Sequence, residues 1–127
     1  MIPIKYRSLL ASGAVVTRNL DQSLALYPQA AWEEIAAELA ALPLTAREAR
    51  GFARLMLSGA MEVEIDRQGR INIPAYLRDY AGIKSSVVVA GVGQKLELWA
   101  EDRWKAETSA WTDDPEKLAE SFSTLGI

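Results

Sequence analysis

The sequence predicts an α+β fold in which two related β units are joined by helices. Three observations indicate this fold. Short apolar runs typical of strands recur at a nearly fixed spacing, a segment with helical periodicity separates the two sets of runs, and 50% of the residues are hydrophobic. A chain of 127 residues with this composition can bury a core without disulfides or a structural metal. We therefore expect two β units that share one core.

Comparison of the chain with itself reveals the repeat. Ile2-Pro3 matches Ile73-Pro74, and Arg7 matches Arg78. The strand-like run Ala14-Val15-Val16 matches Val87-Val88-Val89. Further on, Leu24-Ala25-Leu26-Tyr27 matches Leu96-Glu97-Leu98-Trp99, and Trp32 matches Trp104. The offset is 71 residues for the Ile-Pro and Arg matches and 72 for the Leu and Trp matches. The two copies are therefore expected to differ by one residue in the loop between their strands.

The second copy opens with a hairpin pattern that the first copy lacks. Glu62-Val63-Glu64-Ile65 alternates strictly, a glycine-bearing turn follows, and Arg70-Ile71-Asn72-Ile73 returns before Pro74 ends the strand. The first copy begins at Ile2 without this hairpin. We expect the first unit to be incomplete by one strand pair, with exposed strand edges that a neighbouring chain can complete.

Two helices are expected between the copies. The first begins near Pro28 and ends at Leu42-Pro43, while the second begins at Thr45-Ala46-Arg47-Glu48, which has the spacing of a capping box, and ends at Gly59 as a C-terminal cap. The apolar faces are assigned to Trp32, Ile35, Ala36, Leu39, Phe52, Leu55 and Met56. After Trp104, Asp113-Asp114-Pro115-Glu116 is typical of a further helix start.

These patterns divide the chain into four parts. We expect a first repeat over residues 1–32, connecting helices over 33–60, a second repeat over 61–104 and a helical tail over 105–127.

Composition excludes several classes of function. The chain has no cysteine and no histidine, which removes thiol nucleophiles, Ser-His chemistry and the usual zinc ligands. We expect no enzyme activity, no cofactor, no metal and no small-molecule substrate. No apolar stretch is long enough for a signal peptide or a membrane span, so a soluble cytoplasmic protein is expected. The net charge of -3 does not predict nucleic-acid binding by itself, but a few arginines on one face can supply it.

The turn Asp66-Arg67-Gln68-Gly69-Arg70 is the candidate functional site. A tight hairpin accounts for Asp66, whose carboxylate accepts bonds from turn amides, and for Gly69, which takes a positive φ at little cost. It does not require Arg67, Gln68 or Arg70, whose long donor side chains suit phosphate oxygens or a guanine edge. For Arg70, a salt bridge with Asp66 and a DNA contact are both open, and the two are compatible.

Other candidate residues have simpler explanations. Arg47, Arg50 and Arg54 fall on one helical face, where a solvated or subunit-bridging role is commoner than a DNA-binding strip. The tryptophans at positions 32, 99 and 104 recur with the repeat, which favours core or interface packing over a base-stacking platform, while Trp111 has no assigned role. Asp113 and Asp114 are interpreted as a helix cap and not as metal ligands.

The chain resembles the MraZ family within the wider AbrB-like group. The resemblance covers most of the chain, through "LALYPQAAWEEI", "LPLTAREARGFARLMLSGAMEVEIDRQGRINIPAYLRDYAGI" and "VGQKLELWAEDRW". It implies two intertwined AbrB-like units of the swapped-hairpin type that form one pseudo-twofold barrel with helices outside. It also implies a ring of subunits that presents basic turns to repeated DNA boxes at the division and cell-wall gene cluster, in association with the nucleoid.

The Asp-x-x-x-Arg signature of this family maps only onto Asp66 and Arg70. The leading hypothesis is therefore a sequence-specific DNA-binding transcriptional regulator that acts as a homo-oligomer on double-stranded DNA, with Arg67, Gln68 and Arg70 as contacts. The alternative is a structural ring subunit that assembles but has lost DNA affinity together with the first turn. A hydrolase is the weakest hypothesis, because nothing pairs a nucleophile with a base.

Overall fold

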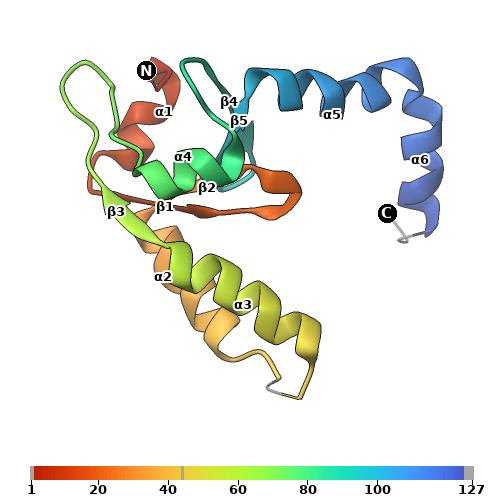
Figure 1. Cartoon of the computed structure of the whole chain (residues 1–127), viewed down its shortest axis with the longest axis horizontal. Helices are drawn as coiled ribbons and strands as arrows, with labels where there is room; N and C mark the ends of the chain where they lie inside the picture. Colours follow the sequence, from red (N-terminus) through yellow and green to blue (C-terminus); the bar gives the residue numbers. More distant parts are fainter. Residues whose placement is uncertain (1, 44, 125–127) are drawn as a thin grey trace.

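The computed structural model describes residues 2–43 and 45–124, and its elements confirm the α+β prediction (Figure 1). The strands are β1 (Ala14–Arg18), β2 (Leu24–Pro28), β3 (Met61–Val63), β4 (Val87–Val92) and β5 (Lys95–Ala100). The α-helices are α1 (Ile4–Arg7), α2 (Gln29–Ala40), α3 (Arg47–Gly59), α4 (Ala75–Ala81), α5 (Glu101–Asp113) and α6 (Pro115–Thr124), and the short 3-10 helices are η1 (Ser8–Leu10) and η2 (Leu20–Gln22).

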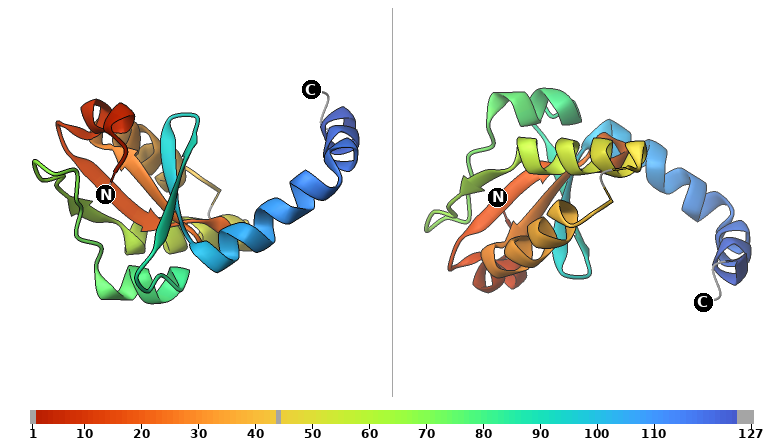
Figure 2. Two further views of the ribbon diagram at one scale, coloured as in Figure 1. Left: turned by 90° about the horizontal axis from the view of Figure 1, so that it is seen from above. Right: turned by 90° about the horizontal axis from the view of Figure 1, so that it is seen from below.

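The strands form one antiparallel sheet in the order β3-β1-β2-β5-β4. The repeats meet at its centre, where β2 pairs with β5 and Leu24 lies opposite Leu98 while Leu26 lies opposite Leu96. Since Leu24 corresponds to Leu96 and Leu26 to Leu98, the two pairs exchange under a twofold rotation. Figure 2 shows the β4–β5 hairpin crossing the β1–β2 hairpin, so the sheet is strongly bent.

The strand register defines how the two copies correspond. Val15 lies opposite Tyr27, and Val88 lies opposite Trp99. Val15 therefore corresponds to Val88 with an offset of 73, while the β2–β5 offset remains 72. The hairpin loops differ by one residue, but the second copy has the shorter one: residues 19–23 connect Arg18 to Leu24, and the equivalent residues 92–95 connect Gly91 to Leu96. The offset therefore falls from 73 to 72 across the loop, and the rise from the 71 of Arg7 and Arg78 lies before the strands.

One face of the bent sheet is buried, as is the opposite face of β1 and β2. One face combines residues of both copies beneath α1, η1 and α4, with Leu10, Leu77 and Ala81 packed onto the central leucines. The opposite face of β1 and β2 carries Val15 and Tyr27 and is covered by α2 and α3. The helical residues in this second cluster include Trp32, Ile35, Ala36, Leu39, Phe52 and Met56, as their spacing predicted.

The predicted hairpin of residues 62–65 and 70–73 is not formed. Only Met61–Val63 is a strand, and it pairs with β1 instead of with the segment that follows the turn. Residues 70–73 have no strand assignment, although Ile71 and Ile73 pack against the core. The apolar alternation thus predicted which side chains are buried, but it did not predict which strand pairs with Met61–Val63.

The outer edge of β4 has no strand partner within residues 2–43 and 45–124. This edge corresponds to the edge of β1 that pairs with β3.

Two predicted caps of α3 are also wrong. The N-cap residue is Ala46, without a side-chain cap hydrogen bond, so the capping box at Thr45 does not form. Gly59 is the last helical residue and does not have a positive φ. A Cβ at Gly59 would lie 2.6 Å from Nε of Arg18, so close packing against β1 accounts for this glycine.

The helix start at Asp113-Asp114-Pro115 is confirmed. The Asp114 carboxylate accepts a hydrogen bond of 3.1 Å from the backbone N–H of Lys117, as expected of an N-cap residue. The tail over residues 105–127 was expected to follow the second repeat. Within the described residues it consists of α6 and most of α5, which begins four residues earlier at Glu101.

The central ladder gives a stability prediction. Leu26 has 0% exposed surface, so Leu26→Ala should lower the free energy of unfolding by about 2–5 kcal/mol, through lost burial and the cavity that remains. The matched control is Leu20→Ala, because Leu20 is 57% exposed and should change stability by no more than about 0.5 kcal/mol. Urea unfolding of both variants checks this, and equal losses would contradict a core centred on β2 and β5.

Candidate nucleic-acid interface

The turn between β3 and α4 projects from the end of the sheet beside α1 (Figure 1). Its backbone is closed by two hydrogen bonds of 3.0 Å, from the Asp66 N–H to the Arg70 carbonyl and from the Gly69 N–H to the Asp66 carbonyl. Oδ1 of Asp66 accepts two more, each of 2.9 Å, from the N–H groups of Gln68 and Arg70. A single carboxylate oxygen therefore holds the tip, and Gly69 adopts a φ of 80°.

The hydrogen bonds to Asp66 favour its charged form. The backbone N–H of Arg70 is the main cause that lowers the pKa of Asp66, with further lowering from the Gln68 N–H and from the charges of Arg70 and Arg7. Partial desolvation opposes this shift. The carboxylate is thus an ionised structural acceptor for turn amides, and the Asp66 side chain is also exposed to solvent.

The three candidate contact residues lie on the outside of this tip. Arg67, Gln68 and Arg70 are all exposed, whereas Gly69 is buried. Within the described residues, no ion pair joins Arg70 to Asp66 at 4.0 Å or less, so the guanidinium acts on the carboxylate only at longer range. The Arg70 side chain is therefore available for an external anion.

The structure adds Arg7, which sequence reasoning identified as a repeat position but not as a site residue. A Cβ at Gly69 would lie 2.3 Å from both Cζ and Nε of Arg7, so this side chain lies directly against the turn. Nε of Arg7 donates to the Ile2 carbonyl at 2.8 Å, and the Ile2 N–H donates to the Gly69 carbonyl at 2.7 Å. The only available signal was the recurrence of Arg7 at Arg78, which does not indicate proximity to the turn.

The other candidates lie away from the turn. Arg47, Arg50 and Arg54 belong to α3, which extends from the opposite side of the sheet (Figure 1). Trp32 and Trp99 are buried, at 9% and 4% exposed surface, and pack within the fold. The arginines of α3 are thus separate from those at the turn, while Arg18, Arg78 and Arg103 belong to neither group.

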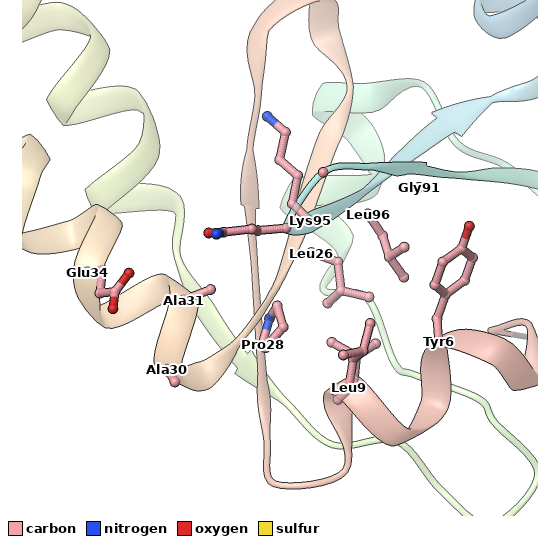
Figure 3. Close-up of a pocket in the computed structure, with 13 residues that line it drawn as sticks. Tyr6, Leu9, Leu26, Pro28, Ala30, Ala31, Glu34, Gly91, Lys95 and Leu96 are labelled. Carbon is pink, nitrogen blue, oxygen red and sulfur yellow. The ribbon is translucent and has the colours of Figure 1, made fainter.

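A pocket of about 470 Å³ lies between η1, the start of α2 and the β4–β5 hairpin (Figure 3). Its lining includes Leu9, Ala31 and Leu96, with Glu34 and Lys95 as charged members. The corresponding space in the second copy is filled. There Tyr80, the counterpart of Leu9, donates to the Asn19 carbonyl at 2.6 Å, and Arg103, the counterpart of Ala31, donates to the carbonyls of Gln22 and Tyr80.

This pocket arises because Leu9 and Ala31 are smaller than their repeat counterparts. No nucleophile paired with a base lies among its lining residues, all of which are described.

Residues 2–43 and 45–124 also contain no group of three or more carboxylate, histidine or cysteine side chains arranged to hold a metal ion. No helix in the described part of the chain combines the length and apolar character needed to cross a bilayer.

A family model described as "MraZ protein, putative antitoxin-like" matches residues 1–55 and 56–121. The chain belongs to the MraZ family. It is 44% identical to the transcriptional regulator MraZ of Herpetosiphon aurantiacus over 99% of this chain and 88% of the relative. It is 42% identical to the MraZ of Leuconostoc mesenteroides over 96% and 85%, and 41% identical to that of Halothermothrix orenii over 100% and 89%. The two matched MraZ segments agree with the two-unit description of the fold.

The hydrogen bonds at Asp66 predict acid sensitivity of the turn at residues 66–70. Because the folded-state pKa is lowered beneath the ordinary value of about 3.9, Asp66 stabilises the turn above that pH, and this contribution is lost as the pH falls through the lowered value. Carboxyl NMR titration should give Asp66 a pKa below its usual range. Asp66→Asn keeps an acceptor oxygen and should remove only the pH dependence, whereas Asp66→Ala should loosen the turn at every pH.

The backbone of Gly69 gives a second prediction for the turn. Gly69→Ala should destabilise the protein by about 1–2 kcal/mol, because alanine disfavours the positive φ, and its Cβ would also displace the Arg7 guanidinium. The double variant Arg7→Ala/Gly69→Ala separates the two causes, since it removes the clash but keeps the φ penalty. Thermal unfolding of both variants measures this, and an unchanged melting temperature for Gly69→Ala would contradict the turn geometry.

Proposed function

We propose that this chain is a sequence-specific DNA-binding transcriptional regulator that contacts double-stranded DNA through the turn at residues 66–70. The observation that carries the proposal is the arrangement of Arg67, Gln68 and Arg70, which are exposed on a tip that Asp66 holds rigid. A preformed tip loses little conformational entropy on binding, so more of the contact energy contributes to affinity. The relatives are described as transcriptional regulators, which supports the same function.

The charges at the tip suit a polyanion. Arg67 and Arg70 have guanidinium groups that pair with phosphate oxygens, and Arg7 contributes a third positive charge beside Gly69. Gln68 carries both a donor and an acceptor, so it is the member of the group suited to reading a base edge. In this proposal the arginines provide affinity and register, while Gln68 or one arginine provides sequence preference.

One such turn offers few contacts, so the proposal includes self-association. A ring-like homo-oligomer would place several turns along repeated promoter boxes of the division and cell-wall gene cluster, and linked weak contacts then act at a high effective concentration. The same proposal places the protein in the cytoplasm with the nucleoid. We also propose that residues 1–32 and 61–104 are the two repeats, that residues 33–60 are connecting helices, and that residues 105–127 are a helical tail.

Removal of one turn arginine should weaken DNA binding without unfolding the protein. Arg70→Ala should lower affinity for tandem promoter repeats, and the slope of log K against log salt should become shallower by about 0.9 for each phosphate that is no longer neutralised. Electrophoretic titration at two salt concentrations checks this result. Lys84→Ala is the control, because Lys84 is an exposed cation that lies beyond α4.

Two results would contradict the regulator hypothesis: absent binding, or salt-independent binding, by a well-folded sample. A large oligomer by light scattering that ignores DNA would instead support the alternative of a structural ring subunit. That alternative is favoured by one observation, since residues 2–43 and 45–124 carry a single Asp-x-x-x-Arg turn. If Arg70→Ala loses thermal stability as strongly as it loses DNA binding, Arg70 has a structural role.

A further inference from the structure

The pocket beside the β4–β5 hairpin has the size of a small-molecule site. Its volume is about 470 Å³, and ligand pockets typically have volumes of about 300–1,000 Å³. Figure 3 shows Tyr6, Leu9 and Leu96 on one side of it, with Ala31 and Glu34 across from them on α2. The Leu9 side chain is 60% exposed, so the wall of the pocket reaches the protein surface. A ligand can therefore enter from solvent.

The second copy of the repeat indicates which chemistry fills this space. There the equivalent space holds the phenol ring of Tyr80 and the guanidinium group of Arg103, at the positions of Leu9 and Ala31. Nη1 of Arg103 donates to the carbonyls of Gln22 and Tyr80, at 3.2 Å each. An aromatic ring next to a cation thus packs against this part of the fold.

The residues that bind the Arg103 guanidinium have equivalents in the pocket. Tyr80 corresponds to Leu9 with the offset of 71, and Gln22 corresponds to Gln94 with the offset of 72. Both Leu9 and Gln94 line the pocket. The first copy therefore has residues equivalent to both carbonyl acceptors, whereas the residue equivalent to Arg103 is an alanine.

A carboxylate lies next to the position of the missing guanidinium. Glu34 follows Ala31 by three residues on α2, and side chains at this spacing are neighbours on one face of a helix. The equivalent position on α5 is Ala106, three residues after Arg103. Among residues 2–43 and 45–124, no ion pair joins Glu34 to a basic side chain at 4.0 Å or less. The first copy thus has a counter-ion for a cation but no cation beside it.

The positive charge in the lining, that of Lys95, is balanced within the fold. Nζ of Lys95 lies 3.9 Å from Oε2 of Glu97 and 5.9 Å from the centroid of the Tyr27 ring. This pairing reduces the repulsion between Lys95 and a bound cation. The remaining lining is mainly apolar, and Tyr6 adds an aromatic ring to it. A ligand therefore needs both an apolar body and a positive charge.

We propose that this pocket binds a small organic cation that carries an aromatic ring, of the class of arylalkyl guanidines and amines. The ring packs between Leu9 and Leu96, as Tyr80 packs in the second copy, and the cation pairs with the Glu34 carboxylate. The bound molecule supplies the groups that the first copy lacks at positions 9 and 31. This site is separate from the turn at residues 66–70, and its occupancy does not require DNA.

The test is an NMR titration of the full chain, without DNA, with N-phenethylguanidine as the probe. Saturable shifts are expected at the amides of Leu9, Ala31 and Leu96, with a dissociation constant of about 1 mM or tighter. Two compounds are matched controls. 3-Phenylpropionate keeps the ring but replaces the cation by a carboxylate, and methylguanidine keeps the cation but lacks the ring. Each should bind at least about tenfold more weakly.

Two variants test the contacts within the pocket. Glu34→Gln keeps the shape of the side chain but removes its charge, so it should weaken probe binding about tenfold. Its matched control is Glu33→Gln, an exposed glutamate on the same helix outside the lining, which should bind as the unchanged chain does. The double variant Leu9→Tyr/Ala31→Arg restores the residues of the second copy. It should abolish binding, because its own side chains then fill the pocket.

Four results would overturn the proposal. These are no saturable shifts at up to about 10 mM probe, equal binding of 3-phenylpropionate, unchanged binding by Glu34→Gln, and normal binding by a folded Leu9→Tyr/Ala31→Arg. Glu34 is exposed, so its variant should fold, and circular dichroism checks this for every variant. If the double variant does not fold, Glu34→Gln and the two control compounds still decide. Failure of the chain to bind DNA while it binds the probe counts against the proposed function alone.

Discussion

The fold depends on the pairing of β2 with β5, where the two repeats meet. Four leucines at this junction are buried, and the pairs Leu24–Leu98 and Leu26–Leu96 exchange under the pseudo-twofold rotation. An antiparallel pair of equivalent strands is the arrangement in which two copies can bury the same apolar face together. Neither copy has this partner within itself, so the sheet order and the core beneath α1, η1 and α4 depend on the junction.

The turn at residues 66–70 is connected to the same architecture through the first copy. The Ile2 N–H bonds to the Gly69 carbonyl, and Arg7 lies against Gly69, so the second copy's tip rests on the segment that begins the first copy. Asp66 satisfies amides that would otherwise face solvent, and it leaves the side chains around it free to point outward. The turn is therefore rigid in its backbone and open in its side chains, as a recognition element needs to be.

Side chains at equivalent positions of the two copies differ in size, and this changes the packing beside each hairpin. Tyr80 and Arg103 fill the space beside the β1–β2 hairpin, whereas their counterparts Leu9 and Ala31 leave the pocket beside β4–β5 open. The helices that follow also differ. Helix α2 connects to α3 through six residues and the two helices pack together, but α5 connects to α6 through Asp114 alone, where the chain turns sharply (Figure 1). Pseudo-symmetry therefore does not extend to the helices that follow each repeat.

The sequence by itself determined the repeat, the strands β1, β2, β4 and β5, the two helices between the copies with their buried faces, and the turn of Asp66 and Gly69, because these depend on local periodicity and on backbone preferences. It did not indicate α1 or α4, and the strand that it predicted over residues 70–73 is not formed. Only the tertiary structure decided that β3 pairs with β1, that Gly59 is small because Arg18 lies over it, and that Arg7 joins the turn. Strand partners, close approaches and side-chain neighbours are set by contacts between residues distant in sequence. The periodicity of the sequence does not indicate those contacts.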